Sequence, residues 1–281
     1  CDHCQAKHDP PADGSYHARP KACAIGGPNV WLGELAKRSL PSARSLERET
    51  SVLEPAGING ELAGIEAIKA TAALIDKGEI IAMRGIGGYH LICDATQDSA
   101  VLKLRELKSR KTKPFAVMCD NKDLLYAPQE IADAIFSPAA PIVIYGWKDH
   151  PLSKHVNPLS NEIGIMQAYT PLHKLLLKYT KTDCIIATSG NRQDEAIVAD
   201  IEEAENRLSY FTEHFLHHNR PIKTRIDDSV AAISAGRLRL LRRGRGYAPV
   251  PTKLPVDTDD HIIFAGGGQL KNCSTIAKDK Y

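Results

Sequence analysis

Short apolar runs, each bounded by glycine, proline or charged residues, recur along the chain and limit what it can fold into. Five of them stand out: Glu79–Met83, Tyr89–Cys93, Phe115–Met118, Pro141–Tyr145 and Ile185–Thr188. Runs this short are typical of buried strands, and a membrane span would need about eighteen consecutive apolar residues. We therefore expect a sheet-based, water-soluble core.

Helical patterns separate several of these runs. Residues 62–75 carry apolar side chains at helical spacing, and Gly78 follows as a helix end. Thr170 before Pro171 is a typical helix start. Further helices are expected over 101–107, 128–136 and 201–208, further strands over 163–166 and 214–217, and a hairpin over 230–241. Strands and helices mix without strict alternation, which predicts an α/β fold with a twisted mixed sheet flanked by helices.

The N-terminal 32 residues resemble a small zinc-finger segment. Cys1 and Cys4 form a Cys-x-x-Cys pair, and Cys23 follows, which makes these three candidate Zn²⁺ ligands. A second pair would need a cysteine at position 26, where the chain has Gly26. The ligand set is incomplete, and three groups can take the fourth place: His3, His17 or water.

The remaining chain divides by composition. Residues 33–60 are rich in proline, glycine, serine and charge and read as a linker. The main folded unit is expected over 61–252. Residues 258–281 contain an apolar strand, a glycine turn and a second strand, which is how an actin-like nucleotide-binding fold opens. The chain begins at Cys1 without a methionine, so we expect it to be part of a longer protein.

A cluster of positive charge lies where a helix gives way to a strand. Six cations occupy residues 103–113, and Pro114 stops the helix before the apolar run that follows. The simplest interpretation of this cluster is a solvent-exposed helix end, since positive side chains are favourable near the carboxyl terminus of a helix. Two later stretches favour an anion site instead. Residues 188–191 end a strand in small polar groups and a glycine, and residues 242–247 alternate arginines with glycines.

Five motifs occur in the order seen in YrdC-like domains, which bind ATP and form carbamoyl-type adenylates. They are Lys108-Ser-Arg110 with Lys113-Pro-Phe, Ala168-Tyr-Thr-Pro-Leu-His173, Thr188-Ser-Gly-Asn191, Arg225-Ile-Asp-Asp-Ser229 and Arg242-Arg-Gly-Arg-Gly-Tyr247. The stretch Met83–Ala95 resembles the version found in HypF carbamoyltransferases of [NiFe]-hydrogenase maturation. Residues 9–28 resemble the second zinc finger of that family, and the last hairpin resembles the start of its transferase domain.

The resemblance implies a site for ATP, Mg²⁺ and carbamate. It gives Lys108 and Arg110 the catalytic role, with Arg110 as the main oxyanion fork. Asp227 or Asp228 would contact Mg²⁺ or orient Arg225, although acidic pairs in turns are commonly structural. Nucleotide or carbamate contacts are expected from Lys113, Tyr169, Thr170, Thr188, Ser189, Asn191, Arg225, Ser229, Arg243 and Arg245, the last two closing over the phosphates.

In the family, the complete protein hydrolyses carbamoyl phosphate, adenylates the resulting carbamate, and passes the carbamoyl group to the C-terminal cysteine of HypE. This chain has no acylphosphatase-like segment and only the first hairpin of the transferase domain. The resemblance therefore implies that the chain carries only the adenylation half.

Two other functions compete with this one. A free-standing threonylcarbamoyl-adenylate synthase acting in tRNA modification shares the YrdC motifs but lacks the cysteine segment and the last hairpin. A non-enzymatic module for double-stranded RNA would need a basic surface, yet the net charge is only +2. Without a membrane-length apolar run or a leader peptide, the expected compartment is the cytoplasm. His90 and His173, within apolar elements, read more simply as core residues than as catalysts.

Overall fold

The computed structural model describes residues 28–34, 62–121, 127–147, 151–267 and 274–281. The candidate zinc ligands Cys1, Cys4 and Cys23, and most of the expected linker, lie outside these residues. Zinc binding by this segment stays a prediction. Among the described residues, no group of three or more histidine, cysteine or acidic side chains is arranged to hold a metal ion.

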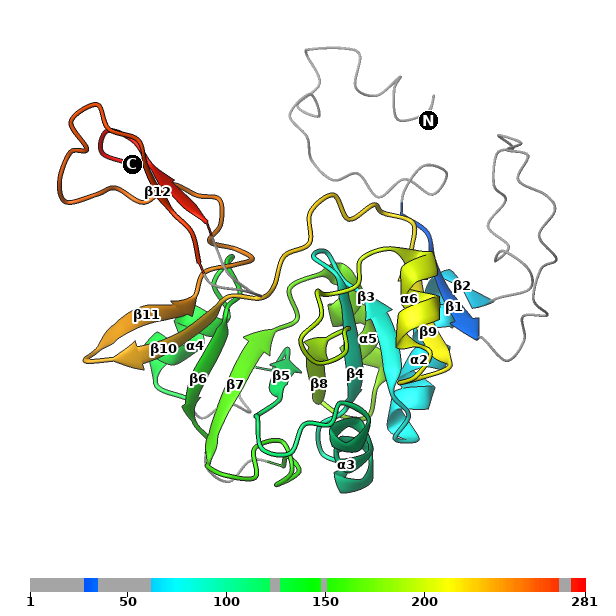
Figure 1. The fold of residues 1–281 in the computed structure, drawn as a ribbon. Coiled ribbons are helices and arrows are strands. Elements are labelled where there is room, and N and C mark those ends of the chain that lie inside the picture. The colour runs from blue at the N-terminus through cyan, green and yellow to red at the C-terminus, as the bar shows by residue number, and fades with distance from the viewer. Residues whose placement is uncertain (1–27, 35–61, 122–126, 148–150, 268–273) are drawn as a thin grey trace, which may run out of the picture.

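The described elements follow one another in mixed order (Figure 1). They are β1 (Val30–Glu34), β2 (Leu62–Ala63), α2 (Gly64–Asp76), β3 (Ile81–Arg84), β4 (Tyr89–Asp94), α3 (Asp98–Leu107), β5 (Ala116–Cys119), α4 (Gln129–Ile135), β6 (Ile142–Gly146), β7 (Glu162–Gln167), α5 (Pro171–Tyr179), β8 (Cys184–Ser189), α6 (Ile201–Leu208), β9 (His214–His218), β10 (Val230–Ser234), β11 (Arg237–Arg242), β12 (Ile263–Ala265) and β13 (Thr275–Ala277).

One sheet organises the described part of the chain. Its eleven strands lie in the order β11-β10-β6-β7-β5-β8-β4-β3-β9-β1-β2. Three neighbouring pairs are parallel, namely β10 with β6, β5 with β7, and β3 with β9. The other pairs are antiparallel. The predicted fold class, a mixed sheet flanked by helices, is confirmed.

Strand alternation divides the sheet's side chains between two cores, because neighbouring residues of a strand point to opposite faces. One core packs α2 and α5 against one face, through residues such as Ile75 and Leu176. The other core receives Leu104 of α3, Ile135 of α4 and Leu208 of α6 on the opposite face. Parallel and antiparallel strands are thereby covered on both sides over most of the sheet, which is what buries their apolar runs.

The helix start at Thr170 and the hairpin over 230–241, both predicted from local sequence, are present in the structure. Thr170 caps α5, its side-chain oxygen accepting a hydrogen bond from the backbone N–H of His173, with Pro171 in the first turn. The hairpin around Ala235 and Gly236 joins β10 to β11. Three cysteines in strands are buried free thiols: Cys93, Cys119 and Cys184.

Two segments differ from expectation. Val30–Glu34 crosses the boundary expected between the zinc-finger-like segment and the linker, and it forms strand β1 between β9 and β2. The helix expected over 62–75 begins at Gly64, because Leu62 pairs with Leu32 as strand β2. Both differences arise from pairing with a strand far away in sequence, which local pattern does not report.

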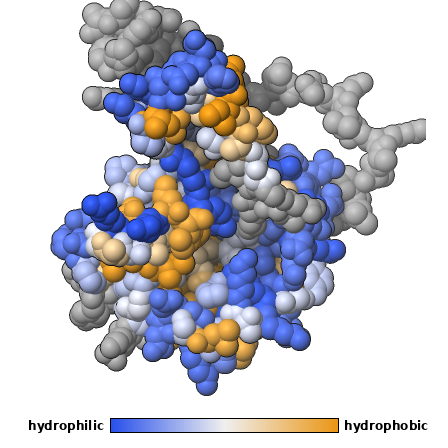
Figure 2. All heavy atoms as spheres, turned by 60° about the vertical axis from the view of Figure 1, so that its left-hand side comes forward, coloured by the Kyte–Doolittle hydropathy of each residue, from blue (hydrophilic) through white to orange (hydrophobic). Residues whose placement is uncertain are grey.

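The strands β12 and β13 form a separate two-stranded hairpin, as predicted. Its apolar side chains, including Phe264 and Ile276, are mostly exposed. Figure 2 brings the β10–β11 end of the molecule forward and shows apolar patches set between hydrophilic ones. None of the helices in the described part of the chain is both long and apolar enough to cross a membrane.

Candidate functional site

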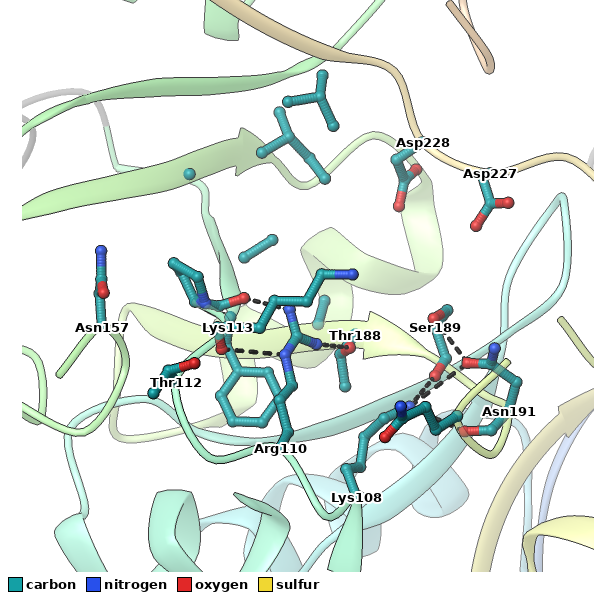
Figure 3. Close-up of a pocket in the computed structure, with 18 of the residues that line it drawn as sticks. Lys108, Arg110, Thr112, Lys113, Asn157, Thr188, Ser189, Asn191, Asp227 and Asp228 are labelled. Carbon is teal, nitrogen blue, oxygen red and sulfur yellow. Dashed lines mark hydrogen bonds between the residues drawn. The ribbon is translucent and has the colours of Figure 1, made fainter. Parts of the chain in front are cut away.

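A cavity of about 670 Å³ lies on the sheet face that α2 and α5 share (Figure 3). Sheet residues of five neighbouring strands form its apolar floor: Ala116, Ile142, Ile144, Gly164, Ala187 and Val230. These residues share one face, since register pairs Ala116 with Gly164, Gly164 with Ile144, and Ile142 with Val230. The polar groups of the site stand around this floor.

The first wall is the loop between α3 and β5, and Arg105 organises it. This side chain is buried, and burial lowers the pKa of its guanidinium. It donates from Nη1 to the carbonyls of Arg110 (2.8 Å) and Lys113 (3.3 Å), and from Nη2 to that of Val156 (2.9 Å). One cation thus satisfies backbone acceptors that the curved loop leaves unpaired.

Ser109 turns the chain out of α3. Its φ of 49° is left-handed, while the Arg110 N–H bonds the Arg105 carbonyl and the Ser109 N–H bonds the Glu106 carbonyl. This pair of bonds is the Schellman arrangement that ends many helices. The turn places Lys108 and Arg110 on the same side of the loop, facing the end of β8 (Figure 3).

Lys108 and Arg110 both contact the end of strand β8. The Lys108 ammonium donates to the carbonyls of Ser189 (2.8 Å) and Asn191 (2.9 Å). Arg110 donates from Nη1 to Thr188 Oγ1 (3.1 Å), from Nε to the Lys113 carbonyl, and from Nη2 to the Pro114 carbonyl. Burial and the charge of Arg105 lower the pKa of Arg110 to about 10, so it is still a cation at neutral pH.

The strand end itself is held by a glycine, for a reason that the sequence did not reveal. A Cβ at Gly190 would lie 2.8 Å from the Tyr89 carbonyl oxygen. The Gly190 N–H donates to that same carbonyl at 2.6 Å. The sequence suggested that the glycine admits a ligand, but the close approach here is to strand β4. It fixes Ser189 and Asn191, whose side chains bond each other at 2.7 Å, at the cavity edge.

Asp227, Asp228 and Arg242 line the cavity on another side. Figure 3 shows the two aspartates above Lys108 and Arg110 in that view. Asp228 accepts a hydrogen bond from Arg245 Nε at 2.8 Å, and its other oxygen lies 3.5 Å from His90 Nε2. Burial alone would raise the pKa of Asp228, but His90 and Arg245 hold it well below its usual range. The carboxylate is therefore ionised.

The structure brings six of the predicted site residues to the cavity: Lys108, Arg110, Lys113, Thr188, Ser189 and Asn191. Four others lie outside the cavity lining: Tyr169, Thr170, Ser229 and Arg245. Of these, Ser229 and Arg245, together with His90, form a buried frame around Asp228. Arg245 lies 3.6 Å above the Tyr169 ring and donates to the Ala139 and Ala140 carbonyls. The Arg245 guanidinium is buried in contacts within the protein and lies outside the cavity lining, so a role in closing over phosphates does not fit this arrangement.

Arg243 and Arg225 also lie outside the cavity lining. Arg243 donates to the carbonyls of Tyr247 and Val250. Arg225 pairs with Glu203 at 2.7 Å. Arg243 closing over phosphates and Arg225 contacting the nucleotide do not fit this arrangement.

The two histidines are core residues. His173 packs against the Tyr169 ring, with centroids 4.6 Å apart, and its Nδ1 lies 2.9 Å from Thr170 Oγ1. Burial, with the nearby His90, lowers the pKa of His173 to about 3, so the ring is neutral at neutral pH. This agrees with the simpler interpretation that the sequence favoured.

The capping role of Thr170 can be tested directly. Thr170→Ala should remove the side-chain acceptor at the start of α5 and lower the free energy of unfolding by about 1 kcal/mol. Thr170→Ser keeps the oxygen and should retain most of the stability. Chemical denaturation of the two variants measures both effects. Equal stability of Thr170→Ala and the parent would contradict the capping role.

Sequence reasoning missed several cavity residues, of which Arg242 matters most; the others include Thr112, Asn157, Arg192 and Glu195. The hairpin pattern gave no signal for Arg242. A regular hairpin centred on Ala235 and Gly236 would place Leu241 opposite Val230, and the irregularity between Val230 and Ala231 places Arg242 there instead. The loop residues carry no comparable pattern.

Comparison with known proteins places the chain in a family. Residues 73–244 match the Sua5–YciO–YrdC family model, described as telomere recombination. The chain is 38% identical to the carbamoyltransferase HypF of Rhodobacter capsulatus over 99% of its own length. It spans only 34% of that relative. A threonylcarbamoyl-AMP synthase of Rattus norvegicus is 25% identical over 60% of the chain.

A solved structure agrees with these relatives. A full-length HypF, in a phosphate- and nucleotide-bound form, is 34% identical and superposes with a TM-score of 0.81. The match covers 100% of this chain and 34% of that protein. The resemblance seen in the motifs is thereby confirmed over the whole chain.

Proposed function

The chain belongs to the Sua5–YciO–YrdC family and is a homologue of the HypF carbamoyltransferases. From this premise we propose that its cavity binds ATP and converts carbamate to carbamoyl-adenylate. The observation that carries the proposal is the meeting of cations and strand-end polar groups around one apolar floor. Lys108 and Arg110 come from the loop after α3, whereas Ser189 and Asn191 come from the end of β8. A flat apolar floor suits a nucleobase, and cationic walls suit phosphates.

The chemistry is a phosphoryl-type displacement. An oxygen of carbamate attacks the α-phosphorus of ATP and forms the new P–O bond. The bond to the bridging oxygen breaks, and pyrophosphate leaves with its electron pair. Such a transfer depends on in-line positioning and charge neutralisation more than on a protein nucleophile. Lys108 and Arg110, both at the cavity wall, supply positive charge for it.

Mg²⁺ would be held by substrate phosphates with one carboxylate of this chain. Mg²⁺ keeps several waters and commonly uses one or two carboxylates. Asp227 fits, since it lines the cavity. Asp228 fits less well, because its two oxygens already face Arg245 and His90. The ion would neutralise phosphate charge.

The test is ATP–pyrophosphate exchange dependent on carbamate generated from carbamoyl phosphate, paired with ATP titration by calorimetry. Exchange that requires carbamate is the expected result. Exchange that instead requires bicarbonate with L-threonine would favour the threonylcarbamoyl-adenylate alternative. Absence of both exchange and ATP binding would refute an adenylate-forming site.

Lys108→Met should weaken ATP binding about thirtyfold, equivalent to ~2 kcal/mol, because it removes a charged donor from the cavity wall. Lys103→Met is the matched control. Lys103 lies on α3, which ends just before Lys108, but it pairs with Glu79 at 3.0 Å and is absent from the cavity lining. Its loss should change affinity less than about twofold, as expected for an exposed pair. Equal effects of the two substitutions would contradict the assignment.

The complete reaction would need more than this chain. The carbamoyl group would pass to the C-terminal cysteine of HypE, with carbamoyl phosphate as the donor. Because the chain spans about a third of the HypF relatives, we propose that it contributes only the adenylation step. Mixing the chain with HypE, ATP and carbamate should therefore yield carbamoyl-adenylate and pyrophosphate without S-carbamoylation of HypE.

A further inference from the structure

The cavity wall that follows strand β8 is a short loop, residues 191–195, which folds back on itself. The Glu195 N–H donates to the Arg192 carbonyl at 3.3 Å, and Asp194 between them has a left-handed φ of 60°. Aspartate adopts that conformation more readily than most residues with a side chain. The turn brings the Glu195 carbonyl to the side chain of Asn191, whose Nδ2 donates to it at 2.7 Å. The backbone of Glu195 therefore sets which way the Asn191 amide faces.

The orientation of this amide decides what the polar edge of the cavity offers to a ligand. With Nδ2 bound to the Glu195 carbonyl, Asn191 Oδ1 accepts the hydrogen bond from Ser189 Oγ at 2.7 Å (Figure 3). The Lys108 ammonium lies 3.4 Å from the same oxygen. A reversed amide would turn its NH₂ group toward the lysine, so that two donors would face each other. The edge of the site thus depends on one backbone carbonyl of the loop.

Helix α6 holds Glu195 by an ion pair. Glu195 Oε2 and Arg207 Nη2 are 2.5 Å apart, and Arg207 Nη1 also donates to Glu203 Oε1. Glu203 and Arg207 are four residues apart, the spacing at which side chains of one helix meet. The other oxygen of Glu203 pairs with Arg225 at 2.7 Å. Arg207 is therefore a branch point, whose guanidinium spans a carboxylate of the loop and a carboxylate of its own helix.

A second contact ties the same loop to the chain just after α6. The guanidinium of Arg192 lies 5.4 Å from the centre of the Tyr210 ring, a cation–π contact. Arg192 and Glu195 both line the cavity, whereas no residue of α6 is among the described residues that line it. Helix α6 thus acts on the cavity from behind the loop, and its contacts reach both ends of the turn.

The exposure of the ion pair limits what it can do for the fold. The side chains of Arg207 and Glu195 are 33% and 38% exposed, and pairs in contact with water stabilise a fold only slightly. A guanidinium that holds two carboxylates does, however, restrict the geometry of both, which a single ammonium does not. The effect of Arg207 is therefore expected at the cavity edge and not in the stability of the whole protein.

We propose that Arg207 of α6 is a positioning residue for the site. Its ion pair holds Glu195, and the Glu195 carbonyl then fixes the Asn191 amide. That amide in turn presents Oδ1 to Ser189 and Lys108. The assignment deepens the proposed function and rests on it for the identity of the ligand, ATP.

Calorimetry with ATP on Arg207→Gln tests the role. ATP binding should weaken about fivefold, the upper end for a partly exposed ion pair, while the free energy of unfolding stays close to that of the parent. Arg207→Lys should recover part of the affinity, because it keeps the charge but not the fork. Lys69→Gln is the matched control, since Lys69 is a helical cation paired with Glu66 at 2.8 Å and is absent from the cavity lining. Equal ATP affinity of Arg207→Gln and Lys69→Gln overturns the proposal.

A double-mutant cycle with Asn191 separates positioning from a general loosening of the loop. In the described hydrogen-bond pattern, Glu195 is the residue that links Arg207 to Asn191. If Arg207 acts through the amide, Arg207→Gln should weaken ATP binding by less than about twofold in the Asn191→Ala background. Losses that multiply in the double variant would show that Arg207 acts otherwise and overturn the proposal.

Amide hydrogen exchange provides a readout that needs no ligand. Exchange over residues 190–195 should be faster in Arg207→Gln by about threefold or more, and unchanged in Lys69→Gln. If the parent chain binds no ATP, the proposed function fails, and this measurement then decides the positioning role by itself. Unchanged exchange over 190–195 in Arg207→Gln contradicts that role, whether or not ATP binds.

Discussion

Gly244→Ala should lower the free energy of unfolding by about 3 kcal/mol, because the added methyl has no space. A Cβ at position 244 would lie 2.3 Å from the Asp227 carbonyl oxygen and 3.5 Å from the Asp228 carbonyl carbon. Both are backbone atoms, so the two segments would have to separate. The neighbouring bond from the Arg245 N–H to the Asp227 carbonyl would be strained with them.

Gly146→Ala is the matched control. A Cβ there meets nothing within 4 Å, so the change should stay within about 0.5 kcal/mol. Chemical denaturation of both variants measures the difference. Gly244→Ala should also weaken ATP binding, since Asp228 and Arg242 depend on that contact. A Gly244→Ala protein as stable as Gly146→Ala would show that the two segments are not pressed together in solution.

Arg105→Lys should destabilise the fold by about 2–3 kcal/mol even though it keeps the positive charge. The guanidinium donates in several directions at once, to the carbonyls of Arg110, Lys113 and Val156 among others. A lysine carries one nitrogen and cannot reach them all. The carbonyls left behind are partly or fully buried and lose their donors.

The same substitution should loosen the wall that carries Lys108. Amide hydrogen exchange is expected to speed up over residues 108–115 and to change little in α6, which shares no contact with Arg105 in the hydrogen-bond pattern. Lys103→Ala controls for charge on the same helix, because its partner Glu79 is exposed and such pairs contribute little. If the Arg105→Lys protein were stable and its amide hydrogen exchange unchanged, the positive charge alone, and not the several hydrogen bonds of the guanidinium, would support the loop.

Much of the fold followed from local pattern. The strand at Tyr89–Asp94, the helix start at Thr170 and the hairpin around Gly236 each depend on residues a few positions apart. Strand β1 did not follow, because it pairs with β9, far along the chain. Its apolar residues became a strand only through that partner.

The residues of the candidate site were likewise predictable only in part. The motif order pointed to Lys108, Arg110, Ser189 and Asn191, and these residues do share one cavity. It assigned Arg243 and Arg245 to the phosphates and left out Arg242, which lines the cavity. The register of β11 against β10, with an irregularity between Val230 and Ala231, sets which arginine faces the floor. The contact of Gly244 with Asp227 then turns Arg245 inward.

The sequence by itself determined that the chain builds a mixed sheet with flanking helices, and that cations and small polar groups follow particular strands and helices. Only the tertiary structure decided which of those groups meet, which arginine of the segment 242–245 lines the cavity, and which residues form a buried frame around Asp228. The physical reason is range: apolar spacing, caps and turns act over a few residues, whereas the direction of a side chain depends on register and close backbone contact between segments distant in sequence.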